Sequence, residues 1–228
     1  LFVIGLFKKL YIADNLGFYV DSFFGSPLLY DTSTAWCVTI AYTLQIYFDF
    51  AGYSDIAIGS SRIMGLNIEE NFRFPYLATS VSGYWKRWHI TLSNWIRDYL
   101  YIPLGGNRRG KVRTYVNVMV AMLLCGLWHG AGWTFVFWGG CHGVALCLNR
   151  MAVYRAKAKK ITHTDSFFVT FLKWLLTFLF LSLVRVPFRS PDFKTTWQIM
   201  GQLFYPHSGV HWINPFAIFI IITTALFH

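Results

Sequence analysis

The pattern of charged and apolar positions gives the first structural prediction for this 228-residue chain. Residues 114–149 form a run of 36 positions without Asp, Glu, Lys or Arg. A soluble domain rarely keeps so long a run free of charge, and about 20 apolar residues are enough to cross a bilayer as a helix. The run is too long for one crossing and suits two. It therefore predicts a membrane hairpin of two helices, with His129 near the turn.

Other apolar segments lie on both sides of this hairpin. Residues 33–48 are free of charge and continue into a Gly- and Ser-rich stretch that contains Asp49 and Asp55. A further span is expected at residues 167–184, and a last apolar run begins near Trp212. The spacing predicts several membrane helices with short connections. In such a setting, a structural role is favoured for the two aspartates, because buried carboxylates need hydrogen-bonded partners.

The expected fold class is therefore all-α, a polytopic transmembrane bundle. We expect residues 1–228 to form a single membrane-embedded core with no separate soluble domain. The chain starts at Leu1 and stops directly after an apolar run, so we also expect it to be part of a longer protein that is truncated at both ends.

Composition and charge refine this picture. Hydrophobic residues make up 55% of the chain and charged residues 13%, whereas soluble domains carry about 25% charged residues. The net charge of +10 would suit nucleic acid, but Lys and Arg gather in two short loops, 105–113 and 150–165, on either side of the charge-free run. Basic loops beside apolar spans mark the cytoplasmic side of a membrane. We therefore expect contact with membrane lipid, no nucleic-acid partner, and both loops in the cytoplasm.

A Trp-rich basic segment precedes the first of these loops. The spacing of its apolar residues predicts one amphipathic helix from Thr79 to Leu100, with Trp85 and Trp88 on the apolar stripe and His89 at the edge of that stripe. A basic helix lined by tryptophan is typical of segments that lie in the membrane interface or re-enter it.

The loop after this segment, residues 101–111, has the glycine spacing of a phosphate-binding loop. However, Val112 follows Lys111 where Ser or Thr would hold magnesium, and no buried strand precedes the loop. A nucleotide-hydrolysing site is therefore rejected. Two interpretations remain: a loop that only sets topology, or a mouth where glycine amides and the side chains of Arg108 and Arg109 receive a phosphate.

Three histidines lie in or beside apolar segments, namely His89, His129 and His142. There is no HExxH motif and no Cys/His cluster, so no metal site is predicted. The spacing of 13 between His129 and His142 admits a haem hypothesis, although glycines between them argue against one continuous helix. A proton-relay or transporter subunit that uses Asp49, Asp55 and His129 is the alternative function. The simplest interpretation of His129 is a histidine that is hydrogen-bonded between packed helices.

Three strings of the sequence carry a resemblance to a known family: FDFAGYSDIAIG, YWKRWHITLSNWIRDYLYIPLGGNRRG and GLWHGAGWTFVFWGGCHG. In this order, and over residues 48–142, they resemble the membrane-bound O-acyltransferase (MBOAT) family. The resemblance is strongest to the branch that O-acetylates alginate and weaker to the branch that transfers D-alanine to teichoic acid. It implies a helix bundle with a tunnel through the membrane, of which this chain would lack the first helices and the extreme C-terminus.

The resemblance also implies roles for individual residues. The family's functional histidines correspond to His129 in WHG and His89 in RWH, as general base and as a positioning or assisting group. The indoles of Trp128 and Trp133 would line an acyl slot, and desolvation would keep the base neutral and able to accept a proton. His142 is expected to contribute mainly packing.

The expected reaction moves an acetyl group from a cytoplasmic thioester, acetyl-CoA, toward the hydroxyl of an extracytoplasmic polysaccharide. No bound cofactor is expected. A periplasmic acetyltransferase would be the partner protein, and the bacterial inner membrane the location, with several crossings.

Overall fold

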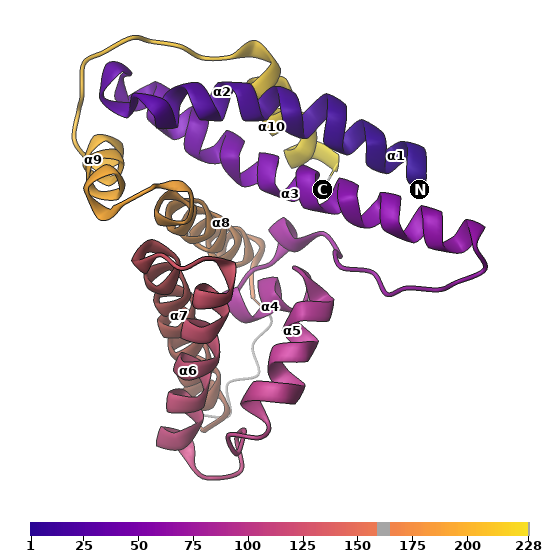
Figure 1. Ribbon diagram of the computed structural model, residues 1–228. Helices are drawn as coiled ribbons and strands as arrows, with labels where there is room; N and C mark the ends of the chain where they lie inside the picture. Colours follow the sequence, from indigo (N-terminus) through magenta and orange to yellow (C-terminus); the bar gives the residue numbers. More distant parts are fainter. Residues whose placement is uncertain (159–164, 228) are drawn as a thin grey trace. The chain divides into compact units, whose positions relative to one another are not determined.

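The computed structural model describes residues 1–158 and 165–227, and throughout this part of the chain the regular structure is helical (Figure 1). This confirms the all-α prediction. The chain divides into two compact units, with Leu1–Asn71 and Leu181–His228 in the first unit and Phe72–Phe180 in the second. The prediction of a single membrane-embedded core stays a prediction.

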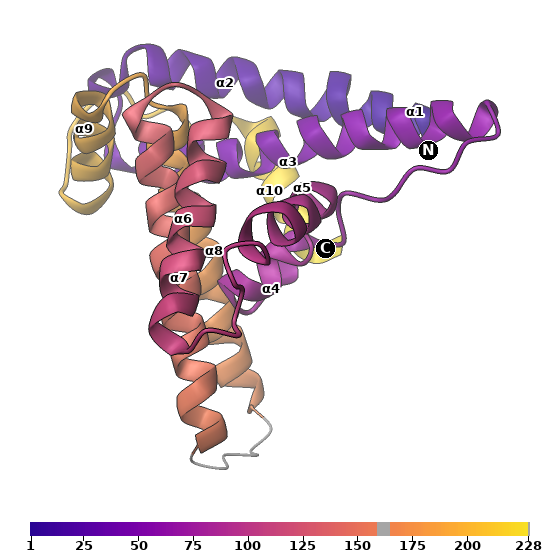
Figure 2. The ribbon, with the colours of Figure 1, turned by 60° about the horizontal axis from the view of Figure 1, so that its bottom comes forward.

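The first unit is built around one long helix. One continuous helical stretch, residues 2–25, runs alongside it in the opposite direction, as Figures 1 and 2 show. The bounds are α1 (Phe2–Leu6), a π-helix (Phe7–Ala13), α2 (Asp14–Gly25), a 3-10 turn (Pro27–Leu29) and α3 (Thr32–Ile63). Tyr19 and Phe23 of α2 are fully buried, as are Ala35 and Val38 of α3. Their spacing of three to four residues is that of one apolar helix face.

Two shorter helices complete the first unit, α9 (Phe193–Phe204) and α10 (Pro215–Phe227). The segment between them pairs with the chain just before α3, because Val210 N donates to Leu29 O at 2.8 Å and Asp31 N donates to Val210 O at 3.1 Å. The carboxylate of Asp31 then accepts from Thr34 N at 2.8 Å and caps α3. At the start of α3, the backbone N–H of Asp31 is therefore bonded to the segment before α10, and that of Thr34 to the capping carboxylate.

The second unit contains the predicted hairpin. Helix α6 (Lys111–His129) and helix α7 (Trp133–Ala158) lie side by side and are joined by residues 130–132 (Figures 1 and 2). The other elements are a 3-10 turn (Pro75–Leu77), α4 (Val81–Trp85), α5 (Ile90–Ile96), a π-helix (Arg97–Tyr101) and the first part of α8 (Phe167–Arg189). The prediction that the charge-free run makes two helices with His129 at their joint is confirmed.

Two glycines allow α6 and α7 to approach closely. A Cβ on Gly139 would collide with the carbonyl oxygen of Met122 and lie 3.2 Å from the Cα of Gly126. A Cβ on Gly126 would in turn collide with the carbonyl oxygen of Phe135. The helices therefore cross backbone to backbone at this pair, which is the packing that small residues provide between membrane helices.

The prediction of one helix from Thr79 to Leu100 is wrong. The chain leaves α4 after Trp85, passes through a break at residues 86–89, and enters α5 at Ile90. The break occurs because Trp88 pairs with Phe72 through an antiparallel bridge, and Arg73 N donates to Arg87 O at 3.0 Å. Helical spacing cannot reveal such a tertiary contact, so the side-chain directions expected from it do not hold beyond the break.

Among the described residues, two helices have the length and composition to cross a membrane, α6 and α8. The apolar segment at Pro215–Ala225 is shorter. Helix α8 continues to Arg189, past the expected end near Val184, and includes Pro187 in its last turn. Of the expected loop 150–165, residues 150–158 belong instead to helix α7, and residues 159–164 lie outside the described part of the chain.

Candidate functional site

His129 is the last residue of α6, directly before the extended Gly130 that ends the helix. Its half-buried ring is held edge-on by two indoles. The ring centroid lies 4.9 Å from that of Trp128 and 5.1 Å from that of Trp138, with interplanar angles of 72° and 87°. These edge-to-face contacts fix the direction of the imidazole more firmly than a bare helix end would.

His89 lies at the break before α5 and has an unusual backbone. Its φ of 44° and ψ of 58° are left-handed, a conformation that is uncommon outside glycine and in which His, Asn and Asp are enriched. Residues held in such conformations cluster at functional sites, where the surrounding packing compensates for the strain. The neighbouring Trp88, buried to 7% exposure, supplies that packing through contacts with Phe72 and Tyr84.

The indole of Trp128 lies between the two histidines, which are 40 residues apart in the sequence. The ring of His89 lies 6.4 Å from that of Trp128, which in turn contacts His129. Burial, and next the nearby His129, lower the pKa of His89 to about 4. His89 is therefore neutral at pH 7, and a neutral imidazole has one donor N–H and one acceptor nitrogen.

A cavity of about 570 Å³ opens beside this pair. Its size is within the range of small-molecule sites, roughly 300–1,000 Å³. His89 lies at its wall, and the remaining wall is mainly apolar: Thr91, Leu92, Trp95, Ile96, Leu100, Leu124, Cys125 and Trp128. An apolar chamber with one or two polar groups is the usual composition of a site that binds a mainly apolar ligand.

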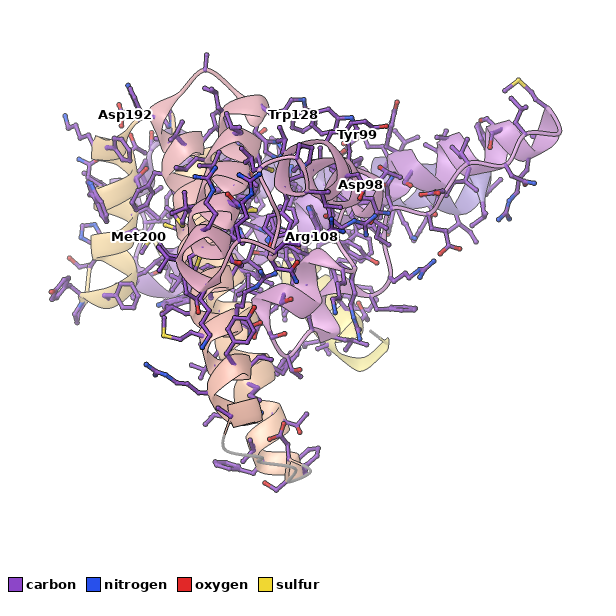
Figure 3. The ribbon with its side chains drawn as sticks, turned by 90° about the horizontal axis from the view of Figure 1, so that it is seen from below. Asp98, Tyr99, Arg108, Trp128, Asp192 and Met200 are labelled. Atoms are coloured by element: carbon purple, nitrogen blue, oxygen red, sulfur yellow. The ribbon has the colours of Figure 1, made fainter. Side chains whose placement is uncertain are left out.

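The structure does not bring every predicted site residue to this cavity. Trp128 lines it, whereas Trp133 begins α7 and is 78% exposed. Arg108 and Arg109 are exposed in the loop before α6. The 19-residue helix places that loop roughly 27 Å from His129, and in Figure 3 Trp128 is labelled beside the turn between α6 and α7, with Arg108 farther from that turn. A phosphate at these arginines would be far from the histidine pair.

Two residues that the sequence analysis did not assign to the site lie beside it. Trp138 of α7 contacts His129, and it also packs at 4.7 Å against the ring of His142 one helical turn later. Trp85 donates from Nε1 to Nδ1 of His142 at 3.3 Å. The i, i+4 spacing of Trp138 and His142 was visible in the sequence and could have indicated their contact. The donor from α4 could not have been found, because it depends on the break after α4.

The carboxylates of the proton-relay hypothesis are engaged by lysines within the first unit. Lys8 Nζ lies 2.6 Å from Asp55 Oδ2, and Lys9 Nζ lies 2.5 Å from Asp49 Oδ1 and 2.9 Å from Asp14 Oδ1. The hydrogen bonds that Lys9 donates to Asp49 and Asp14 raise the pKa of Lys9. These pairs support a structural role for both aspartates.

The positions of His129 and His142 differ from those that the haem hypothesis requires. His129 ends α6 and His142 lies within α7, so the two are not on one helix. Both imidazoles pack on the same indole, that of Trp138. Within the described residues, no group of three or more His, Cys, Asp or Glu side chains is arranged to hold a metal ion.

Comparison with known proteins decides the family. The model of the MBOAT, membrane-bound O-acyltransferase family, matches residues 1–188. The chain belongs to the MBOAT family. Members of this family are membrane proteins, in agreement with the two candidate spans α6 and α8. The expectation drawn from the three sequence strings is thereby confirmed.

Several relatives are similar over most of this chain. The "Probable alginate O-acetylase AlgI" of Pseudomonas syringae pv. tomato is 45% identical over 205 residues, which are 89% of this chain and 38% of the relative. The "Peptidoglycan O-acetyltransferase" of Helicobacter pylori is 41% identical over 200 residues, 88% of this chain and 37% of the relative. The "Teichoic acid D-alanyltransferase" of Streptococcus thermophilus is 32% identical over 167 residues, 64% of this chain and 40% of the relative. The chain thus spans about two fifths of the length of these relatives.

Proposed function

We propose that this chain carries the catalytic centre of a membrane O-acyltransferase. The enzyme would move an acetyl group from a cytoplasmic thioester, acetyl-CoA, toward a hydroxyl of an extracytoplasmic polysaccharide. One observation carries the proposal: His89 lines an apolar cavity whose wall includes Trp128, and the same indole contacts the ring of His129. The names of the relatives support acetyl transfer, since both AlgI and the Helicobacter protein are named for O-acetylation.

The chemistry assigns His129 as the general base. Its imidazole takes the proton of the acceptor hydroxyl while the oxygen attacks the thioester carbonyl. The tetrahedral intermediate then expels the thiolate as the C–S bond breaks, which leaves an oxygen ester. Proton transfer by a positioned base contributes typically about 10²–10⁴ in rate. The neutral His89 donates a hydrogen bond or positions the acceptor, since a charged imidazolium there would be costly in the apolar surroundings.

The cavity suits the donor better than the acceptor. Its apolar wall would bind the acyl end and the apolar part of a thioester carrier, whereas a polysaccharide would leave many hydroxyls unsatisfied there. Trp128 belongs to this slot, whereas Trp133, exposed at the start of α7, and the loop residues Arg108 and Arg109 lie outside it. The arginines, at the far end of α6, remain candidates for the outer, phosphate-bearing part of a carrier.

The cellular setting is also part of the proposal. We expect the full-length protein to cross the bacterial inner membrane several times and to work with a periplasmic acetyltransferase that completes transfer to the polysaccharide. The name of AlgI supports alginate as acceptor, while that of the Helicobacter relative supports peptidoglycan. Polysaccharide O-acetylation is the class that these acceptors share.

The substitution His129→Ala in the full-length protein tests the assignment of the base. Loss of a general base costs roughly 10²–10⁴ in rate, so acetyl groups on the cellular polysaccharide should fall below detection while the amount of protein in the membrane stays normal. Acetyl release by mild alkali and immunoblotting of membranes measure the two quantities.

A matched control is His211→Gln, which changes a histidine of the first unit that pairs with Asp31. This variant should acetylate at the wild-type level. Near-normal acetylation by the His129→Ala protein would contradict the proposed base.

A further inference from the structure

A hydrogen bond links the element before His89 to helix α7. Trp85, the last residue of α4, donates from Nε1 to Nδ1 of His142 at 3.3 Å. Since Nδ1 accepts this bond, it carries no proton, and the neutral ring holds its proton on Nε2. The rings of Trp85 and His142 also meet edge to face, with centroids 5.3 Å apart.

His142 is enclosed by aromatic rings. Its exposure is 2%, and its ring contacts Tyr84 at 6.3 Å, Trp138 at 4.7 Å and Phe180 at 5.5 Å. A buried imidazole in an apolar cluster is costly unless its nitrogens are paired. If this position served packing alone, Leu or Phe would fill it at a lower desolvation cost. The imidazole therefore indicates a role that depends on its hydrogen bonding.

The same cluster contacts His129 and lies close in sequence to His89. The indole of Trp138 contacts two imidazoles. Its ring centroid lies 4.7 Å from that of His142 and 5.1 Å from that of His129. Trp85 precedes His89 by four residues, at the start of the break that gives His89 its left-handed backbone. The bond between Trp85 and His142 therefore ties the segment that carries His89 to the helix whose indole holds His129.

We propose that Trp85 and His142 are positioning residues, whose hydrogen bond keeps His89 in register with His129. This inference rests on the proposed function, because it assigns a role within the same centre. Neither residue touches the reacting atoms. Loss of their bond would let the α4–α5 break shift against α7, and a misplacement of about 1 Å at a catalytic group can cost about 100-fold in rate.

Three variants of the full-length protein separate positioning from packing. Trp85→Phe removes the N–H donor and keeps an aromatic ring. His142→Asn keeps an acceptor oxygen near the place of Nδ1, whereas His142→Leu removes the acceptor and fills the site with an apolar side chain. If packing were the sole role, the Leu variant would be the better of the two, because an unpaired amide is costly in an apolar core.

The measurement is polysaccharide acetylation in cells per molecule of membrane-inserted protein. We expect Trp85→Phe and His142→Leu to lower it about 10- to 100-fold, and His142→Asn to retain more activity than His142→Leu. Trp174→Phe is the matched control, because Trp174 also donates an indole N–H, to Tyr76 O at 2.7 Å in the same unit. This control should keep wild-type activity.

Two results would overturn the inference. One is a Trp85→Phe protein as active as the Trp174→Phe control, and the other is a Leu variant at position 142 that equals or exceeds the Asn variant. Failure of the proposed function is recognised separately, by acetylation that persists in the His129→Ala protein.

Discussion

At the scale of single residues, the centre depends on a local conformation that its own sequence does not favour. Phe74 and His89 are the two non-glycine residues with positive φ in the described part of the chain, and they lie just beyond the paired residues Phe72 and Trp88. A left-handed backbone costs about 1–2 kcal/mol per residue. Burial of the Trp88 indole, worth roughly 1.5–3 kcal/mol for a large apolar side chain, offsets this strain. Tertiary packing thus decides where His89 points.

The low pKa of His89 predicts how stability depends on pH. The unfolded chain protonates His89 below about pH 6.5, whereas the folded chain does so near pH 4, because burial and His129 disfavour the charge. Between these values the unfolded state binds more protons, so stability present above pH 6.5 is lost as the pH falls toward 4.

In purified full-length protein, the melting temperature should therefore fall less between pH 7 and pH 4.5 for His89→Gln than for wild type. Thermal unfolding at both pH values gives the comparison, and the difference between the two proteins removes the contribution of other titrating groups. An identical acid shift in both would contradict a half-buried, neutral His89.

At the scale of elements, the hairpin of α6 and α7 supplies the frame of the site. The charge-free run predicts two helices, but their closeness depends on Gly126 and Gly139, where the backbones touch. This crossing lies within one helical turn of His129 on α6 and of Trp138 on α7. A shift of one helix against the other would therefore separate the imidazole from the indole that holds it.

Alanine substitutions at neighbouring glycines of α7 test the crossing. Gly139→Ala places a methyl group against the carbonyl of Met122 and should destabilise the full-length protein by about 1–3 kcal/mol, as overpacking does. Gly140→Ala is the matched control, since its nearest neighbour would be Leu123 Cδ2 at 3.6 Å, an ordinary contact. Thermal unfolding in detergent should show a lowered midpoint for position 139 alone. Equal midpoints would mean that the helices do not cross there.

At the scale of the whole molecule, topology connects the two sides of the proposed reaction. Basic residues precede α6 and end α7, and α6 places His129 roughly 27 Å from the first of these clusters. If both clusters are cytoplasmic, the histidine pair lies toward the opposite side of the bilayer. A cytoplasmic donor would then have to reach it through the protein.

Single cysteines at two exposed arginines test this topology. Arg109→Cys and Arg155→Cys, each in full-length protein with the native cysteines replaced, should resist a membrane-impermeant maleimide in intact cells and react after permeabilisation. Both positions should behave alike, because the hairpin returns to the side where it began. Labelling of either one from outside would contradict the predicted orientation.

The sequence by itself determined the helical class, the hairpin and the family. Absence of charge over 36 residues and the position of basic loops are properties of composition, and they act through the cost of burying charge, whatever the tertiary structure. Three motifs identified the MBOAT family and singled out His89 and His129. The tertiary structure alone decided the break after α4, the left-handed His89, and the bond from Trp85 to His142. Each of these depends on a contact between residues distant in the chain, such as Phe72 with Trp88, and helical periodicity carries no information about such contacts.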